Sequence, residues 1–215
     1  LTLIESFLCR HNDLTKVIVI GVDEDDRYTK FTDWIALESN KLDAEPTHRD
    51  DFCSLHYSSG TTGLPKGVFH AHKDYPLIAK LSGVDLFDIS ESDRTFAVAK
   101  LFFVYGIGAN LIFPWFVGAS CILYAGTPRQ APAVLKTIER FKPTVFVCVP
   151  TVYGSILSLP NFEERYDVSS IRLCMSAGET LLERLWHAWK DATGLEILDT
   201  IGCTETYHTF MANRP

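Results

Sequence analysis

The sequence lacks any close pairing of its cysteines. Six cysteines stand at positions 9, 53, 121, 148, 174 and 203, and no two of them form a Cys-x-x-Cys motif. Several lie in apolar runs, such as residues 145–149, where a thiol packs as a small hydrophobic group. The pattern predicts reduced, buried core residues of a cytoplasmic protein rather than a disulfide framework.

Clusters of basic residues are also missing. The chain has 20 Lys and Arg against 27 Asp and Glu, for a formal net charge of -7. Binding to a nucleic-acid backbone needs grouped Lys and Arg side chains. The sequence therefore predicts that nucleic acid is not the main partner, although a small anion can still be bound locally.

The chain shows no secretory signal and no repeat. It opens with Leu1 rather than Met and carries no basic stretch before an apolar one, so we expect it to be cut from a longer protein. Residues 101–126 hold no charge and are long enough to span a membrane. Gly106, Gly108, Pro114 and Gly118 interrupt them, which favours a buried helix followed by a strand at 119–124. We expect no membrane partner.

With 47% hydrophobic and 22% charged residues, the 215-residue chain has enough apolar material for a core. Strand-like segments at 94–99, 144–149, 171–175 and 196–199 alternate with helix-like ones. One such helix starts near Pro128 and stops before Pro143, and another ends at Gly194. This alternation predicts an α/β fold of mostly parallel sheets with flanking helices.

Three polar, glycine-bearing loops are expected beyond the carboxyl ends of strands, where ligands of such sheets collect. They are residues 57–68, 176–179 and 199–205. The first follows the apolar run 52–57, and another helix is expected after it. Its glycines free backbone N–H groups, its hydroxyls add donors, Lys66 adds a cation, and Pro65 stiffens the turn. The mixture suits polyphosphate, although the spacing is not that of a Walker loop.

Each loop also has an alternative interpretation in which it plays only a structural role. A Ser/Gly-rich stretch can be a surface linker, and a Ser-Ala-Gly turn or a Thr-Glu pair often only caps a helix. Their order along the chain favours function. The run 57–68 resembles the phosphate-binding signature of the adenylate-forming enzymes. Residues 176–179 resemble that superfamily's adenine-side loop, and residues 201–205 resemble its aromatic-Gly-x-Thr-Glu segment.

The resemblance implies a role for each matching position. Lys66, Thr204 and Glu205 would be catalytic, with the Thr204 hydroxyl on the α-phosphate of ATP and Glu205 holding Mg²⁺. Asp199 would read the adenine amino group, and Ile201 departs from the usual aromatic residue. The implied nucleotide-binding residues are Ser58, Ser59, Gly60, Thr61, Thr62, Gly63, Lys66, Ser176, Ala177, Gly178, Glu179, Asp199, Ile201, Gly202 and Thr204.

Residues 99–108 and 204–210 resemble the matching segments of benzoate-CoA ligases and nearby aryl-CoA ligases. The likeness runs from about residue 50 to the end of the chain. The resemblance implies an apolar slot for an aromatic carboxylate, with Val104, Tyr105, Thr200, Ile201 and His208 as its expected lining. Tyr105 could equally be an ordinary core aromatic, and His208 taken alone is more typical of a satisfied core or surface histidine. His70 and His72 could suggest a metal, but no third ligand is visible.

The implied activity is that of an acid–thiol ligase: ATP and the carboxylate give acyl-AMP, which coenzyme A then converts to a thioester. We expect residues 1–215 to be part of the AMP-binding N-terminal domain, without its first elements and without the C-terminal lid domain. Alone, the chain is expected to be almost inactive and able to self-associate. The alternatives are an adenylation domain that serves a carrier protein and a nucleotide-binding module without acyl chemistry.

Overall fold

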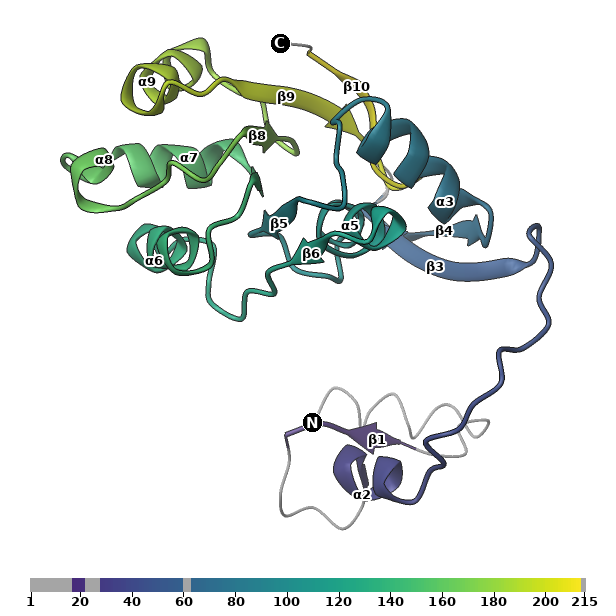
Figure 1. The fold of residues 1–215 in the computed structure, drawn as a ribbon. Helices are drawn as coiled ribbons and strands as arrows, with labels where there is room; N and C mark the ends of the chain where they lie inside the picture. The colour runs from purple at the N-terminus through teal and green to yellow at the C-terminus, as the bar shows by residue number, and fades with distance from the viewer. Residues whose placement is uncertain (1–16, 22–27, 60–62, 214–215) are drawn as a thin grey trace. The chain divides into compact units, whose positions relative to one another are not determined.

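The computed structural model describes residues 17–21, 28–59 and 63–213. The chain divides into two compact units, residues 1–46 and 47–215 (Figure 1). In the first unit, β1 (Ile18–Val19) pairs in parallel with β2 (Thr29–Lys30), and α2 (Phe31–Ala36) follows directly. The candidate site lies in the second unit.

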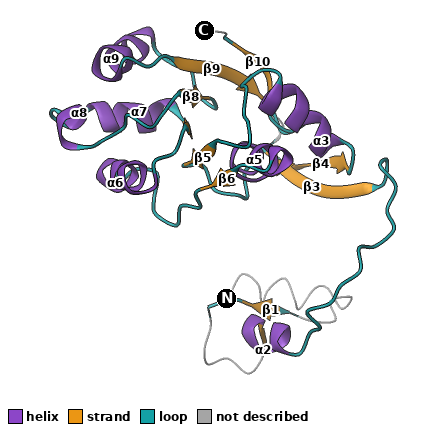
Figure 2. Ribbon diagram, viewed as in Figure 1, coloured by secondary structure: helices purple, strands orange, loops and turns teal. Residues whose placement is uncertain are grey.

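The second unit alternates strands and helices, as Figure 2 shows. Its strands are β3 (Phe52–Ser58), β4 (Lys66–Ala71), β5 (Arg94–Ala97), β6 (Ser120–Cys121), β7 (Val145–Cys148), β8 (Leu173–Ser176), β9 (Ile197–Gly202) and β10 (Thr209–Ala212). Its helices are α3 (Asp74–Ile78), the π-helical η1 (Ala79–Val84), α4 (Val104–Ile107), the π-helical η2 (Gly108–Ile112), α5 (Phe113–Val117), α6 (Ala131–Phe141), α7 (Pro150–Leu157), α8 (Phe162–Arg165) and α9 (Glu183–Thr193).

A six-stranded sheet in the order β10-β9-β8-β7-β5-β6 forms the centre of this unit. All its neighbouring strands are parallel except β10, which runs antiparallel to β9. Because side chains alternate along a strand, each face has its own core. Phe146 packs with residues of α6, α7 and α9, whereas Val145 and Val147 pack with η1, η2 and α5. The predicted α/β class is confirmed.

The uncharged stretch is a helical segment followed by a short strand, as predicted. Residues 104–117 run through α4, η2 and α5, and β6 follows. Within η2, the buried Asn110 accepts a hydrogen bond from Ala97 N at 2.9 Å and donates to Ile122 O at 2.8 Å. A single amide thus links β5 to the end of β6. Within the described residues, no helix has the length and hydrophobicity that a membrane span requires.

The segment after the first loop corrects one expectation. Residues 66–71 form strand β4, which pairs antiparallel with β3 from Ser58↔Lys66 to Phe52↔Ala71, and the helix expected after the loop, α3, begins only at Asp74. The alternation of Val68, Phe69 and His70 suits a strand: Val68 and His70 turn inward, and Phe69 lies 5.2 Å from Phe52 between ring centroids on the outer face. The loop 57–68 therefore lies at the tip of a separate hairpin, not beyond a parallel strand.

The cysteine prediction holds only in part. Cys148 and Cys174 are buried, but Cys53 and Cys203 are exposed, and Cys9 lies outside the described residues. Cys53 is exposed because it lies on the two-stranded hairpin, and Cys203 because it lies in a turn after β9. Exposure at these two positions corrects the expectation of a buried residue.

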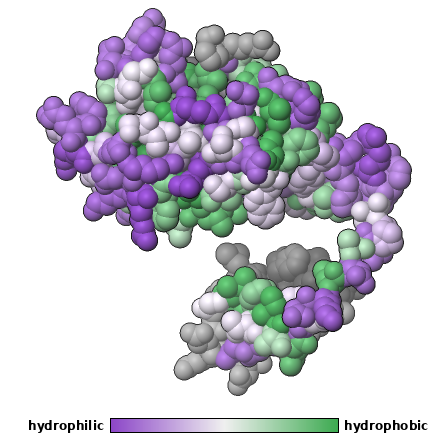
Figure 3. All heavy atoms as spheres, in the orientation of Figure 1, coloured by the Kyte–Doolittle hydropathy of each residue, from purple (hydrophilic) through white to green (hydrophobic). Residues whose placement is uncertain are grey.

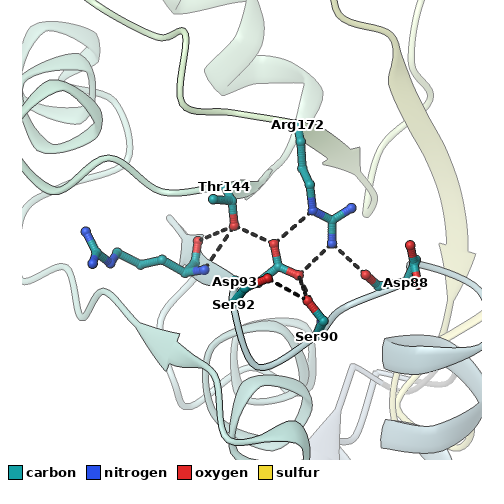
Figure 4. A network of polar contacts seen from close by, with 7 residues as sticks. Asp88, Ser90, Ser92, Asp93, Thr144 and Arg172 are labelled. Carbon is teal, nitrogen blue, oxygen red and sulfur yellow. Dashed lines mark hydrogen bonds and ion pairs between the residues drawn. The ribbon is translucent and has the colours of Figure 1, made fainter.

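The amino ends of the central strands are fastened by one buried carboxylate. Asp93, which is 3% exposed, accepts two hydrogen bonds from Arg172, at 2.8 and 2.6 Å, and one from the Thr144 hydroxyl at 2.6 Å (Figure 4). These residues directly precede β5, β7 and β8. The network therefore closes the end of the sheet opposite to the carboxyl ends of its parallel strands.

Candidate active site

The carboxyl ends of β5, β7, β8 and β9 surround a cavity of about 480 Å³. Its size falls within the range of small-molecule sites, and most of its wall is apolar. It is lined by His56, Tyr57, Val98, Ala99, Lys100, Phe102, Phe103, Val104, Tyr105, Pro128, Cys148, Val149, Val152, Ala177, Gly178, Gly202, Cys203, Thr204, His208 and Thr209.

The structure brings many of the predicted residues to this cavity. Seven of them line it: Val104, Tyr105, Ala177, Gly178, Gly202, Thr204 and His208. Ser176, Asp199 and Thr200 lie outside the lining, and the buried Thr200 hydroxyl donates to Ser176 O at 2.9 Å. Ile201 is 56% exposed. Glu179 accepts a hydrogen bond from Thr151 Oγ1 at 2.9 Å.

Tyr105 and His208 form a stacked pair at one wall, with ring centroids 5.0 Å apart and an interplanar angle of 24°. His208 Nε2 lies 3.2 Å from Tyr105 O, and because a carbonyl can only accept, Nε2 carries the proton. Burial lowers the pKa of His208 to about 4, against the opposite effect of that carbonyl. A Cβ at Gly108 would overlap the His208 ring. The histidine is therefore neutral and tightly held.

Beneath the cavity, the phenol of Tyr105 and the carboxyl of Asp199 lie in a poorly solvated region. Burial raises the pKa of Tyr105 well above its usual value, and the nearby Cys148 and Asp199 add to the effect. Burial also raises the pKa of Asp199, although the Thr200 backbone opposes it. Asp199 Oδ1 is buried without a hydrogen-bond partner. Asp199 is absent from the lining of the cavity, so this unpaired acceptor does not face the space that a ligand would occupy.

The Thr204–Glu205 pair lies in a tight turn. Tyr207 N donates to Thr204 O at 3.1 Å, and Tyr207 has a φ of 67°, which is uncommon for a residue with a side chain. Thr204 faces the main cavity, whereas Glu205 lines a neighbouring hollow with Asp74 and Asp85. Two of the three predicted catalytic residues thus line different hollows on either side of the turn.

The predicted phosphate loop is described only at its ends. Ser58 pairs with Lys66 at the base of the loop, Lys66 and Ser59 are exposed, and Gly63 has a φ of 89°. Gly60, Thr61 and Thr62 lie outside the described residues. The positive φ at Gly63 agrees with the expectation that a glycine is needed there.

A magnesium role for Glu205 is compatible with its surroundings. Over the part of the chain that the structure describes, no three His, Cys, Asp or Glu residues come together to form a metal cage. Magnesium bound to a nucleotide usually takes one or two protein carboxylates and completes its shell with phosphates and water. The exposed Glu205 fits that requirement as a single ligand.

Sequence reasoning missed several residues of the lining. Phe102, Phe103, Val149 and Cys203 belong to it, as does Lys100, whose ammonium donates to Tyr124 O at 2.7 Å and Gly126 O at 2.6 Å. For Lys100, Phe102 and Phe103, the available signal is that residues 99–108 resemble the matching segment of aryl-CoA ligases.

Comparisons with known proteins indicate the family of the chain. Residues 4–215 match the family described as AMP-binding enzyme. A benzoate–CoA ligase of Thauera aromatica is 43% identical over 180 residues, covering 84% of this chain and 34% of that protein. An anthranilate CoA ligase crystallised with anthranoyl-AMP has a TM-score of 0.93 and 55% identity, covering 100% of this chain and 41% of that one.

A benzoate CoA ligase from Burkholderia xenovorans LB400 has a TM-score of 0.81 and 33% identity, covering 97% of this chain and 45% of that one. This chain thus spans less than half the length of each of these proteins. The chain belongs to the AMP-binding family of adenylate-forming enzymes, and within that family it is similar to the aryl-CoA ligases.

Proposed function

We propose that residues 1–215 are part of the AMP-binding N-terminal domain of an aryl-CoA ligase, which activates a benzoate-like or anthranilate-like acid with ATP and passes the acyl group to coenzyme A. The observation that carries this proposal is the apolar cavity next to Thr204 and Gly178. In this proposal, the aromatic ring would lie between Tyr105, Phe102 and the Ala177–Gly178 backbone, with its carboxylate toward Thr204. The substrate would be an aromatic carboxylate, not a peptide or nucleic acid.

In the first step, a carboxylate oxygen attacks the α-phosphorus of ATP, the new P–O bond forms, and pyrophosphate leaves with the electron pair of the broken bond. Charge grows on the phosphoryl oxygens, so the contribution of the protein is electrostatic and positional. Lys66 and the loop amides bind phosphate oxygens, and the Thr204 hydroxyl donates to the α-phosphate. Mg²⁺ on Glu205, when bound, would neutralise phosphate charge.

The proposal is tested in the full-length protein by pyrophosphate exchange with benzoate and with anthranilate. Lys66→Ala removes the phosphate cation and Glu205→Gln removes the carboxylate charge, so each is expected to lower the exchange rate by about 100-fold. Lys73→Ala is a matched control, because that lysine pairs with Asp50 on the surface. Wild-type rates in both site variants would contradict the enzymatic role of this site.

Two other functions remain to be distinguished by the acceptor and by the chemistry. An adenylation domain of an assembly line would transfer the aryl group to a carrier protein and leave coenzyme A unreacted. A nucleotide-binding module would bind ATP and catalyse no exchange with any acid. Thioester formation with coenzyme A separates the proposed ligase from both, and the similarity to aryl-CoA ligases favours it.

A further inference from the structure

A buried histidine outside the predicted site contacts the Thr204–Glu205 turn. His70, on β4, is 4% exposed, and its Nε2 lies 2.8 Å from Thr204 O. A carbonyl oxygen can only accept, so His70 Nε2 donates this hydrogen bond. The bond joins two segments that are 134 residues apart in the sequence.

On its other side, the histidine is enclosed by Asp74 and by an aromatic ring. Its Nδ1 lies 3.3 Å from Asp74 Oδ2, and the same oxygen accepts a hydrogen bond from Ala71 N at 2.9 Å. The Tyr207 ring packs edge-on against the imidazole, with centroids 4.9 Å apart. The ring of His70 therefore has little freedom to turn away from Thr204.

Thr204 O is the point at which the turn is fixed. It accepts from Tyr207 N at 3.1 Å within the turn and from His70 Nε2 at 2.8 Å from outside it. The first bond shapes the turn, and the second fixes it to another element. Because the Thr204 side chain leaves the same residue, a shift of this carbonyl moves the hydroxyl as well.

The strand that carries His70 also carries Lys66. The two residues are four positions apart on β4, about 13 Å along an extended strand. The pairing of β4 with β3 through Ser54↔His70 and Ser58↔Lys66 keeps the distance between Lys66 and His70 fixed. One short hairpin thus links the predicted phosphate cation to the predicted α-phosphate donor.

We propose that His70 is a positioning residue, which sets the Thr204 hydroxyl and the Glu205 carboxylate at a fixed distance from Lys66 through its bond to Thr204 O. This inference rests on the proposed function, since Thr204 and Glu205 act on ATP only in an adenylating enzyme. It needs no metal at the histidine and no proton transfer by it. Its effect should fall on the chemical step rather than on binding of the aromatic acid.

The test compares His70→Leu, which fills similar space without a donor, with His70→Gln, whose amide can donate to Thr204 O. In the full-length protein, His70→Leu is expected to lower kcat for pyrophosphate exchange by about 100-fold, with the KM for the acid unchanged within about twofold. His70→Gln should recover most of kcat. His72→Leu is the control, because His72 lines a different hollow with Arg49 and Lys73.

Hydrogen exchange of the Tyr207 amide, which donates to Thr204 O within the turn, gives a second readout. It should accelerate in His70→Leu and return toward the wild-type rate in His70→Gln, even if the leucine variant is less stable. Wild-type kcat in His70→Leu, or equal losses in the Leu and Gln variants, would overturn the positioning role while leaving the proposed function intact. A wild-type protein without any exchange activity would overturn both.

Discussion

The buried His208 makes stability depend on pH. In the folded protein its pKa is about 4, and its ordinary value is 6.5, so the unfolded chain takes up a proton first as the pH falls. This contribution is present above pH 6.5 and is lost between pH 6.5 and about 4. From pH 7 to pH 5, the free energy of unfolding should fall by about 2 kcal/mol through this residue.

Urea unfolding of wild type and His208→Gln at the two pH values measures that contribution. Glutamine can donate to Tyr105 O and does not titrate, so the variant should lose about 2 kcal/mol less than wild type. Titration of all other groups is common to the two proteins. Equal losses would show that His208 is not the residue that responds to acid.

Asp93 is stabilised in its charged form in the folded protein, whereas His208 is stabilised in its neutral form. Burial raises its pKa, but the hydrogen bonds from Arg172, Thr144 and Ser90 outweigh burial and hold the pKa at about 2. Its stabilisation is therefore complete above pH 4 and lost as the pH falls toward 2. At pH 7, Asp93→Asn should cost about 2 kcal/mol, since Arg172 is partly solvated.

An exposed ion pair serves as the control for the Asp93 variant. Lys190 and Glu196 are 44% and 41% exposed, so Glu196→Gln should leave the urea midpoint nearly unchanged. The difference in the free energy of unfolding between Asp93→Asn and wild type should also become smaller below pH 3. A difference in unfolding free energy that stays constant from pH 7 to pH 2.5 would contradict the ion pair between Asp93 and Arg172.

At the scale of single residues, the sequence indicated Thr204, Gly178, Tyr105 and His208 because motifs and a resemblance covered them. His70 lies four residues after Lys66, yet its hydrogen-bond partner is 134 residues away. A side-chain bond to a distant backbone carbonyl leaves no local pattern. Only the pairing of β3 with β4 and the turn after β9 bring these groups together.

At the scale of elements, the junction of β9 and β10 depends on Gly202. A Cβ at this position would overlap the backbone of His208 and Thr209, and backbone cannot move aside as a flexible side chain can. Gly202→Ala should therefore cost about 2 kcal/mol and accelerate hydrogen exchange along β10. Circular dichroism during urea unfolding and exchange of the amides of residues 209–212 would measure both effects.

Gly154 in α7 is the matched control for that variant. A Cβ there would meet Leu185 at an ordinary 3.7 Å, so Gly154→Ala should leave stability unchanged or raise it by up to about 1 kcal/mol. A Gly202→Ala protein as stable as Gly154→Ala would contradict the close approach of the two strands.

Elements with a clear periodic pattern of apolar residues were predictable from the sequence, whereas the hairpin of β3 and β4 was not. The apolar stripe of α6 and the left-handed Gly194 after α9 follow from local patterns, and both are present. Residues 66–71 carry no such stripe. Their strand exists because β3 pairs with them, and pairing over a loop is a nonlocal choice that composition does not reveal.

At the scale of the molecule, apolar side chains reach the surface. Among the described residues, Leu37, Leu42, Phe102, Trp115 and Leu123 are each at least 66% exposed. Figure 3 shows hydrophobic residues between hydrophilic ones on the face turned to the viewer. We expect the isolated chain to self-associate. Sedimentation velocity at rising concentration should show this, and a monomer up to about 100 μM would contradict it.

The central claim is that the cavity binds an aryl adenylate, and calorimetric titration of this chain tests it most directly. The ligands are a non-hydrolysable benzoyl-AMP analogue, AMP and a long-chain acyl-AMP analogue. Burial of a ring in the apolar cavity should make the benzoyl compound bind at least about tenfold more tightly than either comparison. A benzoyl compound that binds no more tightly than AMP would contradict the claim.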